Sequence, residues 1–202
     1  MSYHMIKILF FLTFVFVPTL AVFPHGSCVA TECSGSPYSL SWSSIDDVNG
    51  KFCFKLIDNN VSSPCASRFR NVTNKIIVKS SPLCKDAFVK VDINDKMKTG
   101  GVYFTLYSGG SEAELVITSM YYNSSQITNL TFCIVAKAPC NTLESFCGGM
   151  PCMFSVYDPY TRSCCPACST TNTTCKPLFP MSVSLPFYYN NLTCSCQCVP
   201  VP

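Results

Sequence analysis

Six residues near the end of the chain, Ser163 to Cys168, could carry chemistry, because they read SCCPAC and place three cysteines within five positions. Such a cluster can form a redox pair, bind zinc or supply halves of structural disulfides. A redox pair needs a helix start to lower the thiol pKa, and no helical pattern follows this motif. Zinc could draw further on Cys194, Cys196 and Cys198, but free thiolates rarely persist where oxidation is available. The spacing therefore favours disulfides, if the chain is secreted.

Cys164 and Cys165 are not expected to bond each other. Neighbouring Cα atoms lie about 3.8 Å apart, whereas disulfides prefer about 4.4–6.8 Å between Cα atoms. We therefore expect this pair to join two different strands to one point of the fold.

The start of the chain predicts secretion. Lys7 precedes an apolar run from Ile8 to Val17, and small residues follow up to Ala21. This pattern is typical of a signal peptide spanning residues 1–21 and cleaved near Ala21. A membrane anchor is the alternative, but it needs about 20 apolar residues, and no later run is long enough for a membrane span. The sequence thus predicts a product in the extracellular space or matrix.

Charge and length exclude some functions. The chain has 202 residues and a formal net charge of +3, with 12% charged residues. Because no dense cluster of Lys or Arg is present, we expect neither nucleic-acid nor membrane-surface binding. The residues that follow the signal fit one domain with a substantial core.

Cysteines and glycosylation sequons mark the rest of the chain as extracellular. All sixteen cysteines follow the signal, so eight disulfides are expected, with a pairing that the sequence does not reveal. These are Cys28, Cys33, Cys53, Cys65, Cys84, Cys133, Cys140, Cys147, Cys152, Cys164, Cys165, Cys168, Cys175, Cys194, Cys196 and Cys198. Asn-x-Ser/Thr sequons, none with proline at x, predict N-glycans at Asn60, Asn71, Asn123, Asn129, Asn172 and Asn191.

Short runs of β-branched and aromatic residues predict an all-β fold. The eight runs are Tyr38–Trp42, Lys51–Ile57, Lys75–Val78, Phe88–Ile93, Val102–Tyr107, Glu114–Thr118, Leu130–Ala136 and Met153–Tyr157. Turn residues such as Asn49-Gly50 and Gly100-Gly101 separate them. Helical periodicity is nearly absent, and only Thr142–Phe146 suggests a short turn. This spacing predicts a disulfide-rich antiparallel β-sandwich or irregular barrel.

Alternation within two runs predicts which residues face the core. In Val102–Tyr107, Val, Phe and Leu share one parity and Tyr, Thr and Tyr the other, as in a half-buried strand. Around residue 130, Leu130, Phe132 and Ile134 share the parity opposite to Asn129. We therefore expect these three in the core and Asn129 in water.

The sequence offers little material for catalysis. His25 is the histidine that remains after signal removal, and we expect it to be solvated beside the new amino terminus. A glycosidase would need two acids across a cleft. Six acids could be considered, namely Asp46, Asp47, Asp92, Asp95, Glu112 and Glu114, but acids in turns are usually solvated. We predict no enzyme activity, no catalytic or metal-binding residue and no cofactor.

The run from Cys133 to Cys168 closely resembles the end of the pherophorin domain of the extracellular matrix of volvocine green algae. It shares a Cys-bearing strand, Cys then Thr-Leu-Glu with a following Cys, Gly and Cys, an aromatic strand and a closing Cys-Cys-Pro-x-Cys. Phe23-Pro24, Ser36-Pro37-Tyr38-Ser39-Leu40 and Phe52-Cys53-Phe54 resemble the family's opening. The resemblance implies a pherophorin-like domain over residues 22–169 and leaves a Cys-rich C-terminal extension at 170–202 outside it.

The resemblance also implies a function. Typical members carry two such domains flanking a hydroxyproline-rich rod, whereas this chain has 14 prolines and no two adjacent. It therefore resembles the diffusible, glycosylated pheromones of the family, which trigger sexual development. A structural or glycan-binding matrix glycoprotein is the alternative.

Partners are expected to be an unknown cell-surface receptor, or glycoproteins and glycans of the extracellular matrix. Candidate contact sites are the loops around Gly109, Gly148 and Gly149 and the tail residues 187–189, with the tail packing on the domain as the alternative.

Overall fold

The strands follow the runs of β-branched and aromatic residues closely. The computed structural model describes residues 23–25, 28–159 and 163–170, and it places ten strands and three α-helices within them. The strands are β1 (Tyr38–Asp46), β2 (Lys51–Asp58), β3 (Lys75–Ser80), β4 (Phe88–Ile93), β5 (Lys96–Met97), β6 (Val102–Tyr107), β7 (Glu112–Ile117), β8 (Thr131–Ala136), β9 (Met153–Tyr157) and β10 (Ala167–Ser169). The helices are α1 (Pro64–Asn71), α2 (Ser124–Ile127) and α3 (Leu143–Cys147).

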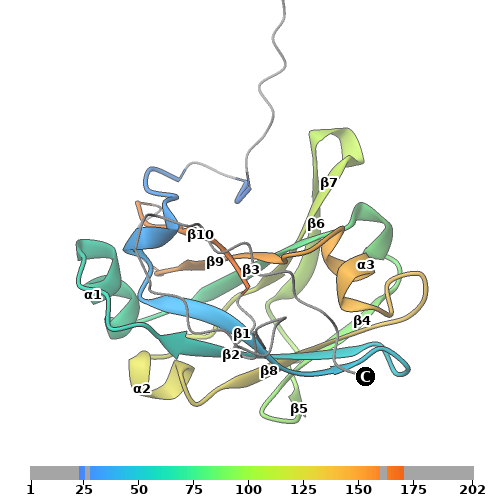
Figure 1. Cartoon of the computed structure of the whole chain (residues 1–202), viewed down its shortest axis with the longest axis horizontal. Coiled ribbons are helices and arrows are strands. Elements are labelled where there is room, and N and C mark those ends of the chain that lie inside the picture. The colour runs from blue at the N-terminus through green and yellow to red at the C-terminus, as the bar shows by residue number, and fades with distance from the viewer. Residues whose placement is uncertain (1–22, 26–27, 160–162, 171–202) are drawn as a thin grey trace, which may run out of the picture.

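Two antiparallel sheets pack face to face as a sandwich (Figure 1). The first sheet has the order β1-β2-β8-β4-β5, and the second has the order β10-β9-β3-β7-β6. Every pairing within the sheets is antiparallel. The predicted disulfide-rich all-β fold is confirmed. Of the two predicted architectures, a sandwich and an irregular barrel, the structure shows the sandwich.

The sequence reveals the longer strands better than the small elements. β4, β6 and β9 coincide with the predicted runs, whereas the two-residue β5, the three-residue β10 and helices α1 and α2 were not predicted. Signals for α1 were nevertheless present, because the Ser63 hydroxyl accepts a hydrogen bond from the Ala66 N–H at 2.9 Å and Pro64 occupies the first turn. The polar composition of α1 hides it from a search for hydrophobic periodicity.

The alternation predicted for β6 is only partly right. Val102 and Phe104 pack against the core, as expected, but Leu106 is 40% exposed. The reason is that β6 is an edge strand that pairs with β7 alone among the described residues, so its far end lies beyond the body of the sandwich.

Aromatic side chains bridge the two sheets in the core. Phe54 and Phe132 stack within the first sheet, with ring centroids 5.2 Å apart. Phe146 of α3 lies 6.0 Å from Phe52 in the first sheet and 6.1 Å from Phe104 in the second. Leu130, Phe132 and Ile134 are all buried in this core, as the alternation predicted, and Asn129 is exposed. The ring of Phe146 thus closes the sandwich where α3 covers it.

Helix α1 is tied to the first sheet by a buried tyrosine. The Tyr38 hydroxyl donates a hydrogen bond to the backbone carbonyl of Phe69 at 3.3 Å. Burial raises the pKa of Tyr38 to about 12. The phenol therefore stays protonated and keeps its role as a donor at any ordinary pH.

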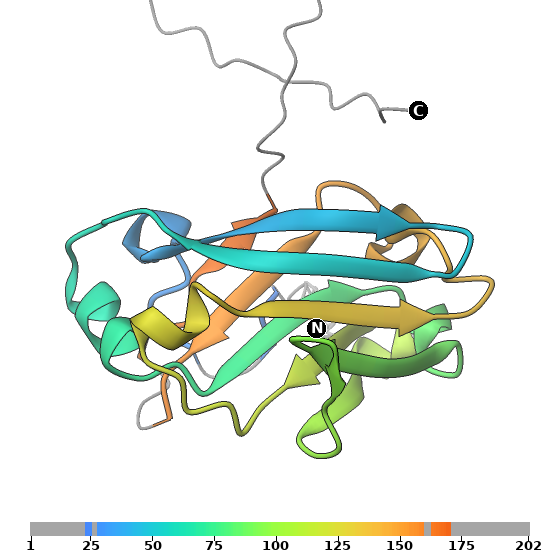
Figure 2. The ribbon, with the colours of Figure 1, turned by 90° about the horizontal axis from the view of Figure 1, so that it is seen from below.

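The antiparallel register assigns every connection to one of two ends (Figures 1 and 2). One end, which we call the α1/α2 end, carries residues 59–74 between β2 and β3 and residues 118–130 between β7 and β8. The opposite end, the α3 end, carries residues 47–50, 81–87, 108–111 and 137–152. The same register places β6 and β7 so that their turn projects at the α3 end.

Gly50 in the β1–β2 turn provides a test of this arrangement. It has a φ of 61°, and a Cβ atom there would overlap the backbone carbonyl of Ala136, which cannot move without disturbing β8. We expect Gly50→Ala to lower the free energy of unfolding by about 2–5 kcal/mol, from left-handed strain plus overlap. Urea unfolding under non-reducing conditions measures this change.

The matched control is Gly109→Ala. Gly109 has a similar φ of 68°, but nothing lies within 4 Å of its added Cβ. Its cost should therefore be about 1–2 kcal/mol, from strain alone. Equal losses for the two variants would show that the close approach at Gly50 is not important.

Candidate functional site

The three cysteines of the SCCPAC motif bond to three different segments. Cys164 pairs with Cys65 at the start of α1, Cys165 with Cys28 and Cys168 with Cys33. The adjacent pair, Cys164 and Cys165, thus holds two separate segments, as expected from the short distance between neighbouring Cα atoms.

Backbone hydrogen bonds reinforce these disulfides. The Ala30 N–H donates to the Ser163 carbonyl at 3.0 Å, and the Cys165 N–H donates to the Ala30 carbonyl at 3.0 Å. The Ala167 N–H also donates to the Thr31 carbonyl, at 2.8 Å. The segments at 28–33 and 163–168 therefore run side by side as one cross-linked unit.

The partners of these cysteines bear on the chemistry of the motif. A thioredoxin-like pair would join Cys165 to Cys168, whereas each of them is bonded to a segment far away in the sequence, and zinc binding would need free thiolates. The observed bonds are those expected of structural disulfide halves. Three more disulfides, Cys53–Cys133, Cys84–Cys140 and Cys147–Cys152, cross-link the sandwich. Cys175, Cys194, Cys196 and Cys198 lie outside the described residues.

The glycosylation sequons gather at one end of the sandwich. Asn60 and Asn71 lie in the β2–β3 connection, and Asn123 and Asn129 lie around α2. All four residues are exposed and belong to the α1/α2 end. Asn172 and Asn191 lie outside the described residues. Glycosylation itself remains a prediction at all six positions.

The geometry at Asn123 suits glycan attachment. Its side-chain oxygen caps α2 by accepting a hydrogen bond from the Gln126 N–H at 3.1 Å. The Ser125 hydroxyl donates to the same oxygen at 2.8 Å. Since a glycan is joined through the amide nitrogen, the capping oxygen can keep its bonds after modification.

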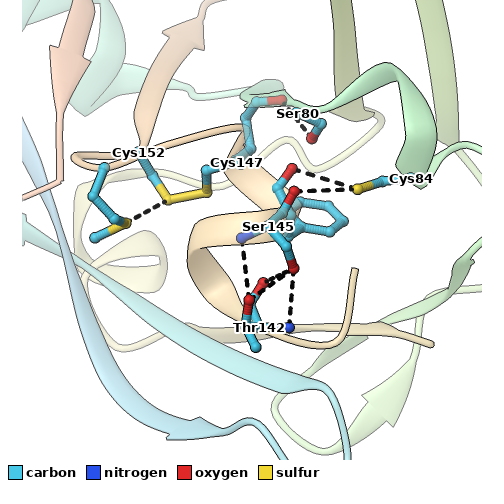
Figure 3. Close-up of a disulfide and its surroundings, with 9 residues drawn as sticks. Ser80, Cys84, Thr142, Ser145, Cys147 and Cys152 are labelled. Carbon is cyan, nitrogen blue, oxygen red and sulfur yellow. Dashed lines mark hydrogen bonds between the residues drawn. A yellow bond between two sulfur atoms is a disulfide. The ribbon is translucent and has the colours of Figure 1, made fainter. Parts of the chain in front are cut away.

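Short-range bonds brace the α3 end (Figure 3). Thr142 and Ser145 form a capping box at the start of α3, in which the Thr142 hydroxyl accepts from the Ser145 N–H at 3.2 Å. The disulfide between Cys147 and Cys152 closes the loop that follows. Cys84, bonded to Cys140, lies with its sulfur 3.6 Å from the Ser145 carbonyl oxygen. These bonds fix the 81–87 and 137–152 connections against each other.

Apolar side chains are exposed at the α3 end. Val48 is 92% exposed in the β1–β2 turn, Leu83 is 75% exposed beside Cys84, and Met150 is exposed in the disulfide-closed loop. The connections that carry them touch: the Asn141 side chain donates to the Asp47 carbonyl at 3.1 Å, and Gly148 lies against Ser81.

Of the contact sites expected from sequence, Gly109, Gly148 and Gly149 all belong to the α3 end. These loops, which lie about 40 residues apart in sequence, thus belong to the same end of the sandwich. Residues 187–189 of the tail lie outside the described residues. Val48 and Leu83 were missed, because exposed apolar residues in turns carry no sequence signal of their own.

The expectation that His25 is solvated is wrong. Its side chain is only 5% exposed, and its two ring nitrogens lie 2.6 Å from Glu112 and 2.9 Å from Glu114. Glu114, expected to be solvated, is fully buried. The sequence could not show this contact because the partners lie 87 and 89 residues apart.

The other acids considered for catalysis are dispersed. Asp92 binds Lys90 at 2.9 Å, and Asp95 lies 3.9 Å from Lys51. Asp46 accepts hydrogen bonds from the Asn49 backbone and side chain, which lower the pKa of its carboxyl. Asp47 contributes its backbone carbonyl to the contact with Asn141. In the described ranges, no three His, Cys, Asp or Glu side chains are grouped so that they could hold a metal ion.

The fold and its cross-links define a class before any comparison: an antiparallel β-sandwich held by disulfides, of the kind found outside cells. No helix in the part of the chain that the structure describes is long and apolar enough to cross a bilayer. The family model described as pherophorin matches residues 23–166, and the chain belongs to the pherophorin family. No curated protein and no solved structure matches the chain. Family and fold together fit an extracellular matrix glycoprotein.

Two variants near Asn123 can separate the effect of losing the glycan from the effect of losing the helix cap on stability. Ser125→Ala removes the sequon but keeps the capping side chain, whereas Asn123→Gln removes both. We expect both variants to lose the same glycan mass, and Asn123→Gln alone to lower the free energy of unfolding by a further ~1 kcal/mol. Mass spectrometry and urea unfolding of the secreted proteins measure the two effects. Identical glycan masses on wild type and Ser125→Ala would contradict glycosylation at Asn123.

A second prediction concerns the loop that carries Asn60. Arg70 donates to both carboxylate oxygens of Asp58, at 2.8 and 2.6 Å, and to the Val61 carbonyl at 2.8 Å. The guanidinium lowers the pKa of Asp58 below its usual value. Stability from this pair is therefore present above the unfolded-state pKa of about 3.9 and is lost as pH falls through the lower folded-state pKa.

Asp58→Asn removes this titration. We expect the variant to be less stable than wild type at neutral pH, with the difference shrinking as the pH is lowered towards 3. Thermal unfolding at several pH values measures it. The control is Asp47→Asn, at an exposed acid whose backbone carbonyl, and not its carboxylate, takes part in the contact with Asn141. A pH-independent difference for Asp58→Asn would exclude the ion pair as its cause.

Proposed function

We propose that this protein is a secreted, N-glycosylated and diffusible pheromone that triggers sexual development by binding a receptor or a matrix partner. The observation that carries the proposal is the division of the molecular surface between the two ends of the sandwich. Predicted glycans occupy the α1/α2 end, whereas the α3 end has braced loops, exposed Val48 and Leu83, and none of the described sequons. Apolar residues such as Val29 and Tyr121 are exposed elsewhere, so the distribution of the sequons is what separates the two ends. On this proposal the protein acts by recognition and not by catalysis.

Glycans at the four described sequons would shield one end from protein contacts. N-glycans are bulky and hydrated, so they keep neighbouring surface in water. The α3 end has none of the described sequons and exposes Val48 and Leu83. Apolar side chains on a surface free of glycans favour this end as the binding surface.

Disulfides would make this end an effective ligand. Cys84–Cys140 and Cys147–Cys152 hold two of its connections, residues 81–87 and 137–152, before any partner binds. Ordering loops on binding costs free energy, and a surface that is already ordered avoids much of that cost. Such preorganisation supports tight binding at the low concentrations at which a pheromone acts.

A matrix glycoprotein that binds structural partners or glycans is the second candidate. Membership of the pherophorin family favours it, because family and fold fit an extracellular matrix glycoprotein. It would use the same fold and the same disulfides. The two candidates differ in whether trace amounts of soluble protein change the development of cells.

Addition of purified secreted protein to vegetative cultures of a volvocine green alga, over a dilution series, tests the proposal. We expect sexual cells to form at trace concentrations, with most of the protein remaining in the medium. Retention in the matrix without any developmental response at any dilution would favour the structural candidate instead.

Surface variants test the role of the α3 end. Val48→Lys and Leu83→Lys should each raise the concentration needed for a response by about tenfold, because binding energy concentrates in a few buried contacts. Val29→Lys is the matched control, since Val29 is 87% exposed but lies outside the α3 end. A stronger effect of Val29→Lys would place the binding surface elsewhere.

A further inference from the structure

Residues 23–25 cross the outer face of the second sheet. Phe23 is buried there in a small apolar cluster with Ile77, Val116 and Tyr157, separate from the main core. This cluster lies on the face opposite to the core, because the neighbouring residues Ile76 and Ile117 belong to the main core. The N-terminal segment therefore covers an apolar patch that would otherwise be exposed.

His25 holds this segment in place. Its ring stacks on Tyr107, with centroids 4.0 Å apart and planes 8° from parallel. Nε2 lies 2.6 Å from Glu112 Oε2, and Nδ1 lies 2.9 Å from Glu114 Oε1. The His25 backbone N–H donates to the same Glu114 oxygen at 2.7 Å. Four contacts thus converge on one residue.

The contacts suit one form of the ring. Two ionised carboxylates only accept hydrogen bonds, so a ring that bonds both of them donates from both nitrogens, as only the doubly protonated imidazolium can. Glu114 is fully buried, and its other carboxylate oxygen has no hydrogen-bond partner among the described residues. An imidazolium at His25 would compensate a negative charge on Glu114.

The other charged and titratable groups that face this site come from three strands. Glu112 and Glu114 belong to β7, Tyr103 and Tyr107 belong to β6, and Lys79 on β3 lies opposite Glu114. Burial, with the charge of Glu114 adding to it, raises the pKa of Tyr107, so this phenol stays neutral. Imidazole is the side chain that gains or loses a proton near neutral pH.

The segment is tethered as well as clamped. Cys28, three residues after His25, is joined to Cys165 by a disulfide. If the contacts of His25 were lost, residues 23–25 could swing away while Cys28 stayed attached. The tether would allow repeated opening and closing.

We propose that residues 23–25 form a pH-dependent latch, which is closed by the imidazolium of His25 between Glu112 and Glu114 and opens as the ring loses a proton at rising pH. The neutral ring presents a lone pair to one carboxylate, which removes a hydrogen bond and leaves two negative charges with no cation between them. Because the proton favours the closed form, closure is complete at lower pH and is lost as pH rises. Opening uncovers Ile77, Val116 and Tyr157 and does not depend on the proposed function.

Nuclear magnetic resonance of the secreted protein labelled with ¹⁵N-histidine tests the latch. Ring ¹⁵N shifts report protonation, and exchange of the His25 amide hydrogen reports opening, after correction for the intrinsic pH dependence of exchange. We expect protection of this amide to fall at least about tenfold between pH 6 and pH 9, since a hydrogen bond between charged partners is lost. Binding of an apolar fluorescent dye should rise over the same range. His25→Ala assigns the signals and should bind dye at both pH values.

Glu112→Gln distinguishes a latch from a merely structural contact. Its amide can donate to an unprotonated Nε2, so this variant should stay closed at pH 9, and Glu112 is partly exposed, so folding should tolerate the change. Equal protection of wild type at pH 6 and pH 9 would overturn the proposal. So would a Glu112→Gln variant that opens with the same pH profile as wild type.

Discussion

The cross-linking of the first and last described segments is the constraint on which the rest of the structure depends. Cys28, Cys33 and Cys65 near the start bond to Cys165, Cys168 and Cys164 near the end. These bonds hold β10 in place beside β9 and hold the start of α1 against the same point. Without them, a three-residue strand would have little else to order it.

The antiparallel topology of the sheets organises the surface. Because the sheets are antiparallel, each connection falls at one of two ends, and the sequons that the structure describes all fall at one of them. The other end carries two local disulfides and the ring of Phe146 between the sheets. Among the described residues, a single fold thus places the four predicted glycan sites at one end and these disulfides at the other.

Sequence predicts those parts of the structure that local pattern determines. Strands such as β4 and β9 were predicted at their observed bounds because β-branched and aromatic residues alternate within them. Covalent geometry alone predicted that Cys164 and Cys165 bond to two different segments and not to each other. The identity of those partners did not, because sixteen cysteines allow a very large number of pairings.

What local pattern does not determine could not be predicted. His25 contacts acids on a strand almost ninety residues away, and only the folded sheet brings Glu112 and Glu114 onto the face that the N-terminal segment crosses. The exposure of Leu106 likewise depends on β6 lying at an edge, which its own sequence does not reveal. Both wrong predictions, for His25 and for Leu106, concern position in the folded sheet and not residue type.

The disulfide between Cys33 and Cys168 spans 135 residues and encloses all but the ends of the described chain. A protease that cut one peptide bond in any loop between these cysteines would produce two fragments that remain in a single covalent molecule. Since most strand pairs and the core would also remain in contact, the nicked protein could keep its shape. Survival among extracellular proteases would then depend less on hiding loops than on keeping this ring of chain closed.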